Sequence, residues 1–166
     1  MRTLLLMRHA KSSRDDPQLE DHDRPLNARG LQDAPRMGAL LRTMGLIPDS
    51  IFSSTALRAL RTARLVAREC RFDKALVATD DLYHASENDL REQIRQLPDS
   101  DTLVLCVGHN PGLEDFLSSW IGQYVRMPTA AIARLSFDQD AWPEIADHAS
   151  ATLVDLWRPR DLPAQS

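Results

Sequence analysis

The chain has 166 residues, of which 43% are hydrophobic and 27% are charged, a balance typical of one globular domain and not of a disordered chain. Its formal net charge of −4 disfavours non-specific binding to nucleic acid or to anionic lipid. The sequence has no apolar run near the roughly 18 residues of a membrane span, and its N-terminal run TLLLM is too short for a signal-peptide core. We therefore expect a cytoplasmic protein without nucleic-acid or membrane partners.

Short apolar runs alternate along the chain with longer segments of helical periodicity. The runs predict strands at Thr3–Met7, Ser50–Ser53, Ala75–Thr79, Thr102–Val107, Ile132–Phe137 and Thr152–Trp157. The periodic segments predict a first helix that ends before Gly45, and further helices at about Ala56–Cys70, Glu87–Leu97 and Pro111–Ile121. The last two strands are expected to form an edge hairpin or an antiparallel pair.

The start of the first helix has two possible caps, Asn27 and Asp33. Pro35 interrupts the helical pattern, so the helix either begins there or carries a distortion. We favour a single helix with an irregular first turn.

Strand–helix alternation of this kind predicts an α/β layered fold with a largely parallel sheet. We expect residues 1–158 to form one domain and residues 159–166, which include two prolines, to form a short and loosely ordered tail. Cys70 and Cys106 lie in apolar patterns and are expected to be buried and reduced.

The segment Ala10–Leu26 is the one long predicted loop, and it is rich in Asp and Pro. One interpretation is a solvated acidic loop on the surface. The other is that the loop borders a binding site and repels small polyanions, in which case neutralising Asp15 and Asp16 should change which anions the site accepts.

Ligands of parallel α/β sheets bind beyond the carboxyl ends of the strands. The residues at those ends include Arg8, His9, Arg58, His84 and His109. Two guanidinium groups can bind an oxyanion with forked hydrogen bonds, and a neutral imidazole in line with phosphorus is a competent nucleophile. The strand ends therefore predict an anion site, and they are compatible with a phosphatase that requires no cofactor.

The segment Asp21-His22-Asp23 resembles a fragment of a calcium-binding loop. It lacks the glycine and the terminal glutamate of such loops, so we expect no metal there.

Four short motifs together resemble the histidine phosphatase superfamily. LLLMRHAKS is similar to its Arg-His-Gly signature, with Ala10 in place of the usual glycine, and SSTALRALRTA and VGHNPGLEDF resemble two further family motifs. The run Asp21–Gly30 and the short chain resemble the SixA-type phosphohistidine phosphatase branch. The resemblance covers residues 1 to about 135, and it implies a phosphoglycerate mutase-like fold, a three-layer sandwich with a mostly parallel central sheet flanked by helices.

The resemblance also implies roles for individual residues. His9 becomes the phosphoryl acceptor, Arg8 and Arg58 become phosphate clamps, and His109 stabilises the group in transfer. Substrate-binding positions are implied for Lys11, Ser12 and Asn110, the last through its backbone N–H.

Many members of the superfamily carry a glutamate or aspartate after the third strand, which protonates the leaving group. Here His84 lies near that position, Glu87 is a second candidate, and Asp89 and Glu114 are rivals. An alkoxide leaving group needs strong acid assistance, whereas the nitrogen of a phosphoramidate departs readily once it is protonated. A weak acid therefore favours phosphohistidine as the substrate.

The sequence leaves several functions open. The first is a metal-independent phosphatase that hydrolyses phosphohistidine on a protein of the phosphotransfer or phosphorelay type through phospho-His9. The alternatives are a phosphatase of small phosphorylated molecules and a module that binds a phospho-ligand without turnover. A mutase is disfavoured because the chain is too short to enclose an intermediate.

Overall fold

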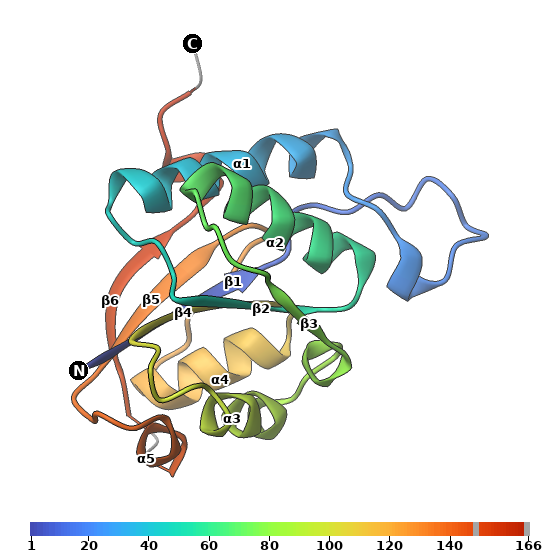
Figure 1. Cartoon of the computed structure of the whole chain (residues 1–166). Helices are drawn as coiled ribbons and strands as arrows, with labels where there is room; N and C mark the ends of the chain where they lie inside the picture. Colours follow the sequence, from blue (N-terminus) through green and yellow to red (C-terminus); the bar gives the residue numbers. More distant parts are fainter. Residues whose placement is uncertain (148–149, 165–166) are drawn as a thin grey trace.

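The structure is a computed structural model that describes residues 1–147 and 150–164. In this part of the chain one sheet runs through the molecule in the strand order β3-β2-β4-β1-β5-β6 (Figure 1). The strands are β1 (Arg2–Arg8), β2 (Ser50–Ser54), β3 (Val77–Thr79), β4 (Leu103–Gly108), β5 (Ile132–Phe137) and β6 (Thr152–Trp157). Strands β1 to β4 are mutually parallel, whereas β5 runs antiparallel to β1 and β6 runs antiparallel to β5.

Helices cover both faces of the sheet, as Figure 1 shows. One layer contains α1 (Ala28–Thr43) and α2 (Leu57–Cys70), and the other contains α3 (Glu87–Arg95), α4 (Gly112–Ile121) and α5 (Trp142–Asp147). Short 3-10 turns occur at η1 (Asp21–Asp23), η2 (Asp80–Leu82) and η3 (Pro159–Asp161). The predicted α/β sandwich with a mostly parallel central sheet is confirmed.

The alternation of side chains in β1 explains the two cores. Leu4 and Leu6 pack in the cluster that contains α3 and α4, while Leu5 and Met7 pack in the cluster that contains α1 and α2. Successive side chains of a strand point to opposite faces, so a strand covered on both faces must be apolar at every position. Burial of both faces of β1 therefore explains why the apolar run at the N-terminus is uninterrupted.

The first helix begins at Ala28, because the side chain of Asn27 caps it by accepting a hydrogen bond from the N–H of Gly30 at 2.9 Å. Pro35 lies inside this helix, so the expectation of a single helix is confirmed. Asp33 does not cap it but lies buried beside Arg36.

Three elements differ from the sequence-based expectations. β3 begins at Val77, two residues later than predicted, and α5 lies within a segment predicted to be a connection. The segment from residue 158 to 164 is not loose, because Pro159 is buried and Arg36 donates to the carbonyl of Pro163 at 3.1 Å. The rest of the predicted tail, Gln165 and Ser166, lies outside the described residues.

Cys70 and Cys106 are buried free cysteines, as predicted. Among the described residues, none of the helices combines the length and the apolar character that crossing a membrane demands.

Candidate active site

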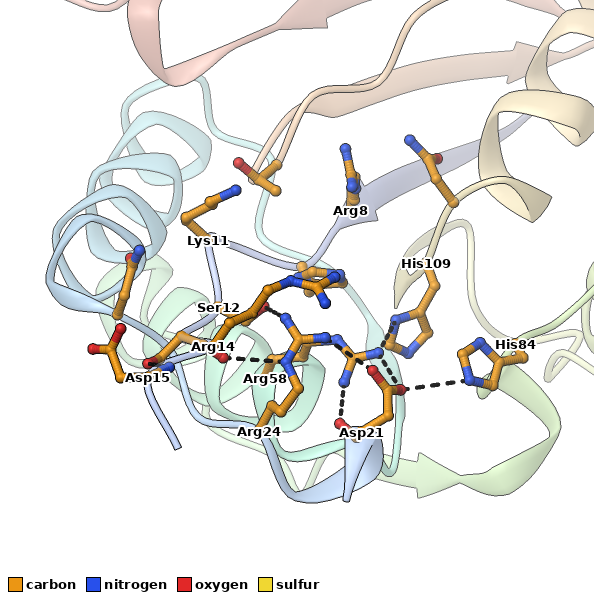
Figure 2. A pocket seen from close by; sticks show the side chains of 15 residues that line it. Arg8, Lys11, Ser12, Arg14, Asp15, Asp21, Arg24, Arg58, His84 and His109 are labelled. Carbon is orange, nitrogen blue, oxygen red and sulfur yellow. Dashed lines mark hydrogen bonds and ion pairs between the residues drawn. The ribbon is translucent and has the colours of Figure 1, made fainter. Parts of the chain in front are cut away.

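A pocket of about 460 Å³ opens at the carboxyl ends of the parallel strands (Figure 2). Its lining includes the following residues that the sequence singled out: Arg8, His9, Lys11, Ser12, Arg58, His84, His109 and Asn110. The topology brings them together because β1, β2 and β4 are neighbours in the sheet and end at the same edge.

Glu87, the second candidate for the proton donor, is not part of this lining. It lies on α3 and accepts a hydrogen bond from Arg91 at 2.8 Å. Its rival Asp89 closes the capping box of α3 with Ser86, and Glu114 accepts from the backbone N–H of Met127 at 2.8 Å. The described geometry therefore leaves His84 as the residue of this group that faces the pocket.

His9 is held in one tautomer by its own backbone. Its Nδ1 lies 2.7 Å from the carbonyl oxygen of Ala10, and a carbonyl only accepts, so Nδ1 carries the proton. Nε2 consequently keeps its lone pair. The segment is fixed further because the N–H of Ala10 donates to Oγ1 of Thr62 at 3.0 Å.

Both pocket histidines at the centre of the site are neutral at physiological pH. Burial lowers the pKa of His9 to about 4, with further lowering by the charge of Arg58, although its bond to Ala10 acts the other way. Burial, reinforced by His9 and Arg58, lowers the pKa of His109 to about 3. A neutral His9 is the form that can attack phosphorus.

His109 stands beside His9, with 5.1 Å between the ring centroids. Its Nδ1 lies 3.4 Å from a guanidinium nitrogen of Arg58, which can only donate, so Nδ1 accepts. Its Nε2 lies 2.8 Å from Oγ of Ser54 and therefore donates to it. The second histidine is thus oriented from the end of β2.

Asp21 is a pocket residue to which the sequence interpretation gave no role. Arg58 donates to its carbonyl oxygen at 2.6 Å and to its carboxylate at 3.0 Å, and Arg24 donates to the other carboxylate oxygen at 2.9 Å (Figure 2). Burial acts against ionisation, but hydrogen bonds from Tyr83 and Arg58 hold the pKa of Asp21 well below the ordinary aspartate value. One carboxylate therefore aligns two cations.

Arg14 and Arg24 also line the pocket and were missed. The signal for Arg24 and Asp21 was present, since both lie in the run Asp21–Gly30 that was used to recognise the family branch. A loop gives no periodicity from which the direction of a side chain can be predicted.

Arg8 reaches the pocket from the end of β1. It donates through Nη1 to the carbonyl oxygen of Met127 at 3.1 Å, and the side-chain amide of Asn110 donates to the same oxygen at 2.9 Å. The guanidinium and the amide are thereby held side by side.

His84 has a left-handed backbone conformation with φ of 52°, which costs a non-glycine residue strain of about 1 kcal/mol or more. Its ring packs on Tyr83 with 4.0 Å between centroids, and its Nε2 lies 3.5 Å from the carboxylate of Asp21. The side chain is 61% exposed. It therefore lies where the pocket meets solvent.

The acidic loop Ala10–Leu26 borders the pocket, because it contributes Asp15 and Asp21 to the lining. Its base is closed by an isolated bridge between Ser12 and Leu26. Within residues 1–147 and 150–164, no group of three or more His, Cys, Asp or Glu side chains is arranged to hold a metal ion. His22 of the calcium-loop fragment instead lies 2.9 Å from Oγ1 of Thr55.

The pocket can bind a tetrahedral oxyanion, since guanidinium groups from β1 and α2 face it together with a neutral imidazole. Nε2 of His9 can accept a phosphoryl group, and charge that builds on its equatorial oxygens would meet the arginines.

The sequence model of the histidine phosphatase superfamily, branch 1, matches residues 4–92. An uncharacterized chloroplastic protein of Arabidopsis thaliana is 33% identical over 153 residues, which cover 86% of this chain and 70% of that protein. An uncharacterized protein of Mycobacterium leprae is 30% identical over 167 residues, covering 93% of this chain and all of that protein.

Solved structures with a similar fold include a protein from Agrobacterium tumefaciens assigned as the phosphohistidine phosphatase SixA. Its TM-score is 0.81 at 28% identity, over 95% of this chain and 98% of that chain. The protein histidine phosphatase SixA in complex with tungstate has a TM-score of 0.83 at 19% identity, over 97% of this chain and 99% of that chain.

Proposed function

This chain belongs to branch 1 of the histidine phosphatase superfamily and is a phosphatase with a SixA-like structure, and on that basis we propose that it hydrolyses protein-bound phosphohistidine through a phospho-His9 intermediate. A phospho-substrate follows from the family. The substrate class, the residue roles and the extent of the catalytic domain, residues 1–158, are the parts that we propose.

The proposal rests on which side chain of the segment after β3 is available in the pocket as a proton donor. The carboxylates of Glu87 and Asp89 are engaged on α3, and His84 is the titratable residue of that segment that lines the pocket. An imidazolium is a sufficient acid for a phosphoramidate nitrogen but a poor one for an alkoxide. This favours phosphohistidine over alkyl phosphates.

In the first step, Nε2 of His9 attacks phosphorus in line with the scissile P–N bond. The P–Nε2 bond forms as the P–N bond to the substrate breaks, and the leaving imidazole takes its proton from His84. Arg8, Arg58 and His109 surround the transferring group, and Lys11, Ser12 and Asn110 contact its oxygens or the substrate at the rim.

In the second step, water attacks the phosphoryl group on His9. The P–O bond forms as P–Nε2 breaks, the water gives its proton to His84, and inorganic phosphate leaves. The neutral tautomer of His9 is restored, because the proton stays on its Nδ1, hydrogen-bonded to the carbonyl oxygen of Ala10, throughout.

The partner in this proposal is a phosphoprotein of the phosphotransfer or phosphorelay type. Its histidine must enter a pocket of about 460 Å³ whose mouth carries His84. A free small phosphorylated molecule fits the same volume and is the alternative that the experiment must separate.

The test compares wild type with His9→Ala on a phosphohistidine protein and on an alkyl phosphate such as glycerol phosphate. We expect faster hydrolysis of phosphohistidine, loss of turnover in the variant, and radiolabelled phosphate retained on wild-type His9 after a quench without acid. Faster hydrolysis of the alkyl phosphate would overturn the substrate class. Binding of phosphate without any turnover would leave a binding module, and full activity in His9→Ala would remove the mechanism.

A further inference from the structure

The connection between α4 and β5 supplies a backbone acceptor to the active site. The carbonyl oxygen of Met127 accepts from Arg8 at 3.1 Å and from Asn110 at 2.9 Å, so this one oxygen sets how two pocket residues lie. Met127 itself belongs to neither a helix nor a strand. The direction of its carbonyl must therefore be fixed by other contacts.

Glu114 provides such a contact from the first turn of α4. Its Oε1 accepts from the N–H of Met127 at 2.8 Å, and its Oε2 lies 3.4 Å from the hydroxyl of Tyr124. The side chain of Met127 is fully buried in a core cluster, which anchors the residue a second time. The N–H and the Cβ of Met127 are thus both held.

Pro128 removes much of the remaining freedom. A residue that precedes proline is confined to extended values of ψ, because the proline ring would clash in the helical region. With the N–H and the side chain of Met127 held and its ψ restricted, its carbonyl has one accessible direction. That direction is towards Arg8.

The charge of Glu114 is consistent with this arrangement. Burial lowers the pKa of Arg8, and the attraction of Glu114 opposes that effect. Glu114 is not part of the pocket lining, and both of its carboxylate oxygens have partners, so it is poorly placed to act as the acid for a leaving group.

We propose that Glu114 is a positioning residue, which aligns Arg8 on the phosphoryl group through the backbone of Met127. The inference rests on the proposed role of Arg8 as a phosphate ligand, but it does not depend on which phosphorylated molecule is the substrate.

The test uses two matched variants that separate reach from charge. Glu114→Gln keeps the length of the side chain and an oxygen acceptor but loses the charge. Glu114→Asp keeps the charge but is one methylene shorter, which withdraws the acceptor from the N–H of Met127. Each variant is measured with 4-nitrophenyl phosphate and by the inhibition constant of vanadate.

We expect Glu114→Gln to stay within about threefold of wild type, and Glu114→Asp to lose roughly 10- to 100-fold in kcat/KM with weaker vanadate inhibition, because small displacements of a positioned group are costly in catalysis. Ser118→Ala is the stability control, since it removes a bond from α4 to this connection that does not involve Glu114, from Val125 N–H to Ser118 Oγ at 3.0 Å. It should lower the melting temperature and leave the kinetics within twofold.

The reverse order, with Glu114→Gln impaired and Glu114→Asp active, would mean that the charge acts directly and would overturn the inference. Equal activity of both variants and wild type would do the same. If wild type neither turns over 4-nitrophenyl phosphate nor binds vanadate, the proposed function fails instead, which is a separable outcome.

Discussion

At the scale of single residues, Asp21 is unusual because it places a negative charge inside an anion pocket. It is bound on one side by Arg58 and on the other by Arg24. A guanidinium that is already fixed loses little conformational freedom when an oxyanion binds. The carboxylate of Asp21 therefore weakens the attraction of the pocket for an anion, but it holds the arginines in the orientation that binding requires.

Replacing Asp21 with Asn should lower kcat/KM by about tenfold or more, because the amide keeps only one acceptor oxygen and its side chain can no longer accept from both Arg58 and Arg24. Steady-state kinetics would measure this, with Asp23→Asn on the same turn as the control. Asp23 is 65% exposed and pairs with His22 at 3.6 Å. A rise in activity in Asp21→Asn would mean that the charge only repels the substrate.

The low pKa of His9 predicts a pH-dependent stability. The pKa falls from an ordinary 6.5 to about 4 in the folded state, so between these values the unfolded chain binds a proton on this residue and the folded chain does not. The free energy of unfolding should therefore decrease as the pH falls from 6.5 towards 4, by about 2 to 3 kcal/mol from His9. Urea denaturation at pH 7 and pH 4.5 would measure it.

The control for this prediction is His9→Asn, which cannot titrate. Its stability should decline less steeply over the same interval, while the contribution of the carboxylates is common to both proteins. Parallel curves for the two proteins would show that His9 is already protonated in the folded state.

The location of residues that follow a strand directly could be predicted from the sequence. His9 and His109 continue the direction of β1 and β4, so the edge of the sheet at which they lie follows from the hydrophobic pattern alone. Asp21 and Arg24 could not be placed in this way, because their positions depend on how a long loop folds back over the strand ends.

At the scale of elements, the start of α4 packs so closely against the segment before α3 that there is no space for a further side-chain atom between them. A Cβ on Gly112 would lie 1.9 Å from the carbonyl oxygen of Ala85, which is far inside contact distance. Ala85 follows His84 directly, so the start of α4 sets where the candidate proton donor stands. Only the smallest residue permits this contact.

Gly112→Ala should therefore displace the segment around His84, destabilise the protein by roughly 1–3 kcal/mol and lower activity. Thermal unfolding and kinetics with a phosphohistidine protein would test both effects. Gly108→Ala is the control, since its Cβ would find its nearest neighbour at 3.7 Å in the side chain of Leu113. Wild-type behaviour in Gly112→Ala would contradict the tight contact.

The element that the sequence failed to predict, α5, and the strand whose start it misplaced, β3, are both short. α5 spans Trp142–Asp147 and β3 only Val77–Thr79, and segments of that length show less than two turns of a helical period or a single alternation of a strand. Their structure comes from what they pack against, as the complete burial of Trp142 indicates.

At the scale of the whole molecule, an acidic chain concentrates cations in one pocket. The net charge is −4, yet Arg8, Arg14, Arg24 and Arg58 line the same cavity, with Asp15 at its border. Such a distribution attracts one phosphoryl group at short range and repels additional anionic groups farther out.

The double variant Asp15→Asn/Asp16→Asn should raise kcat/KM for multiply phosphorylated small molecules about two- to fivefold relative to singly phosphorylated ones. The gain should shrink in 0.5 M salt, because exposed charges are screened. Asp73→Asn/Asp138→Asn makes the same change in net charge outside the pocket lining and should leave the ratio unchanged. An unaltered ratio in the first variant would identify the loop as a solvated surface only.

The pairing of β1 with β4 affects the order in which parts of the enzyme form during folding. Arg8 lies opposite Gly108 in that ladder, so the two central histidines become neighbours through a contact between distant parts of the chain. Closing so long a loop is slow compared with forming a helix. Catalytic competence should therefore appear late in refolding, after helical circular dichroism has recovered, and recovery of turnover would time the moment at which the centre of the sheet closes.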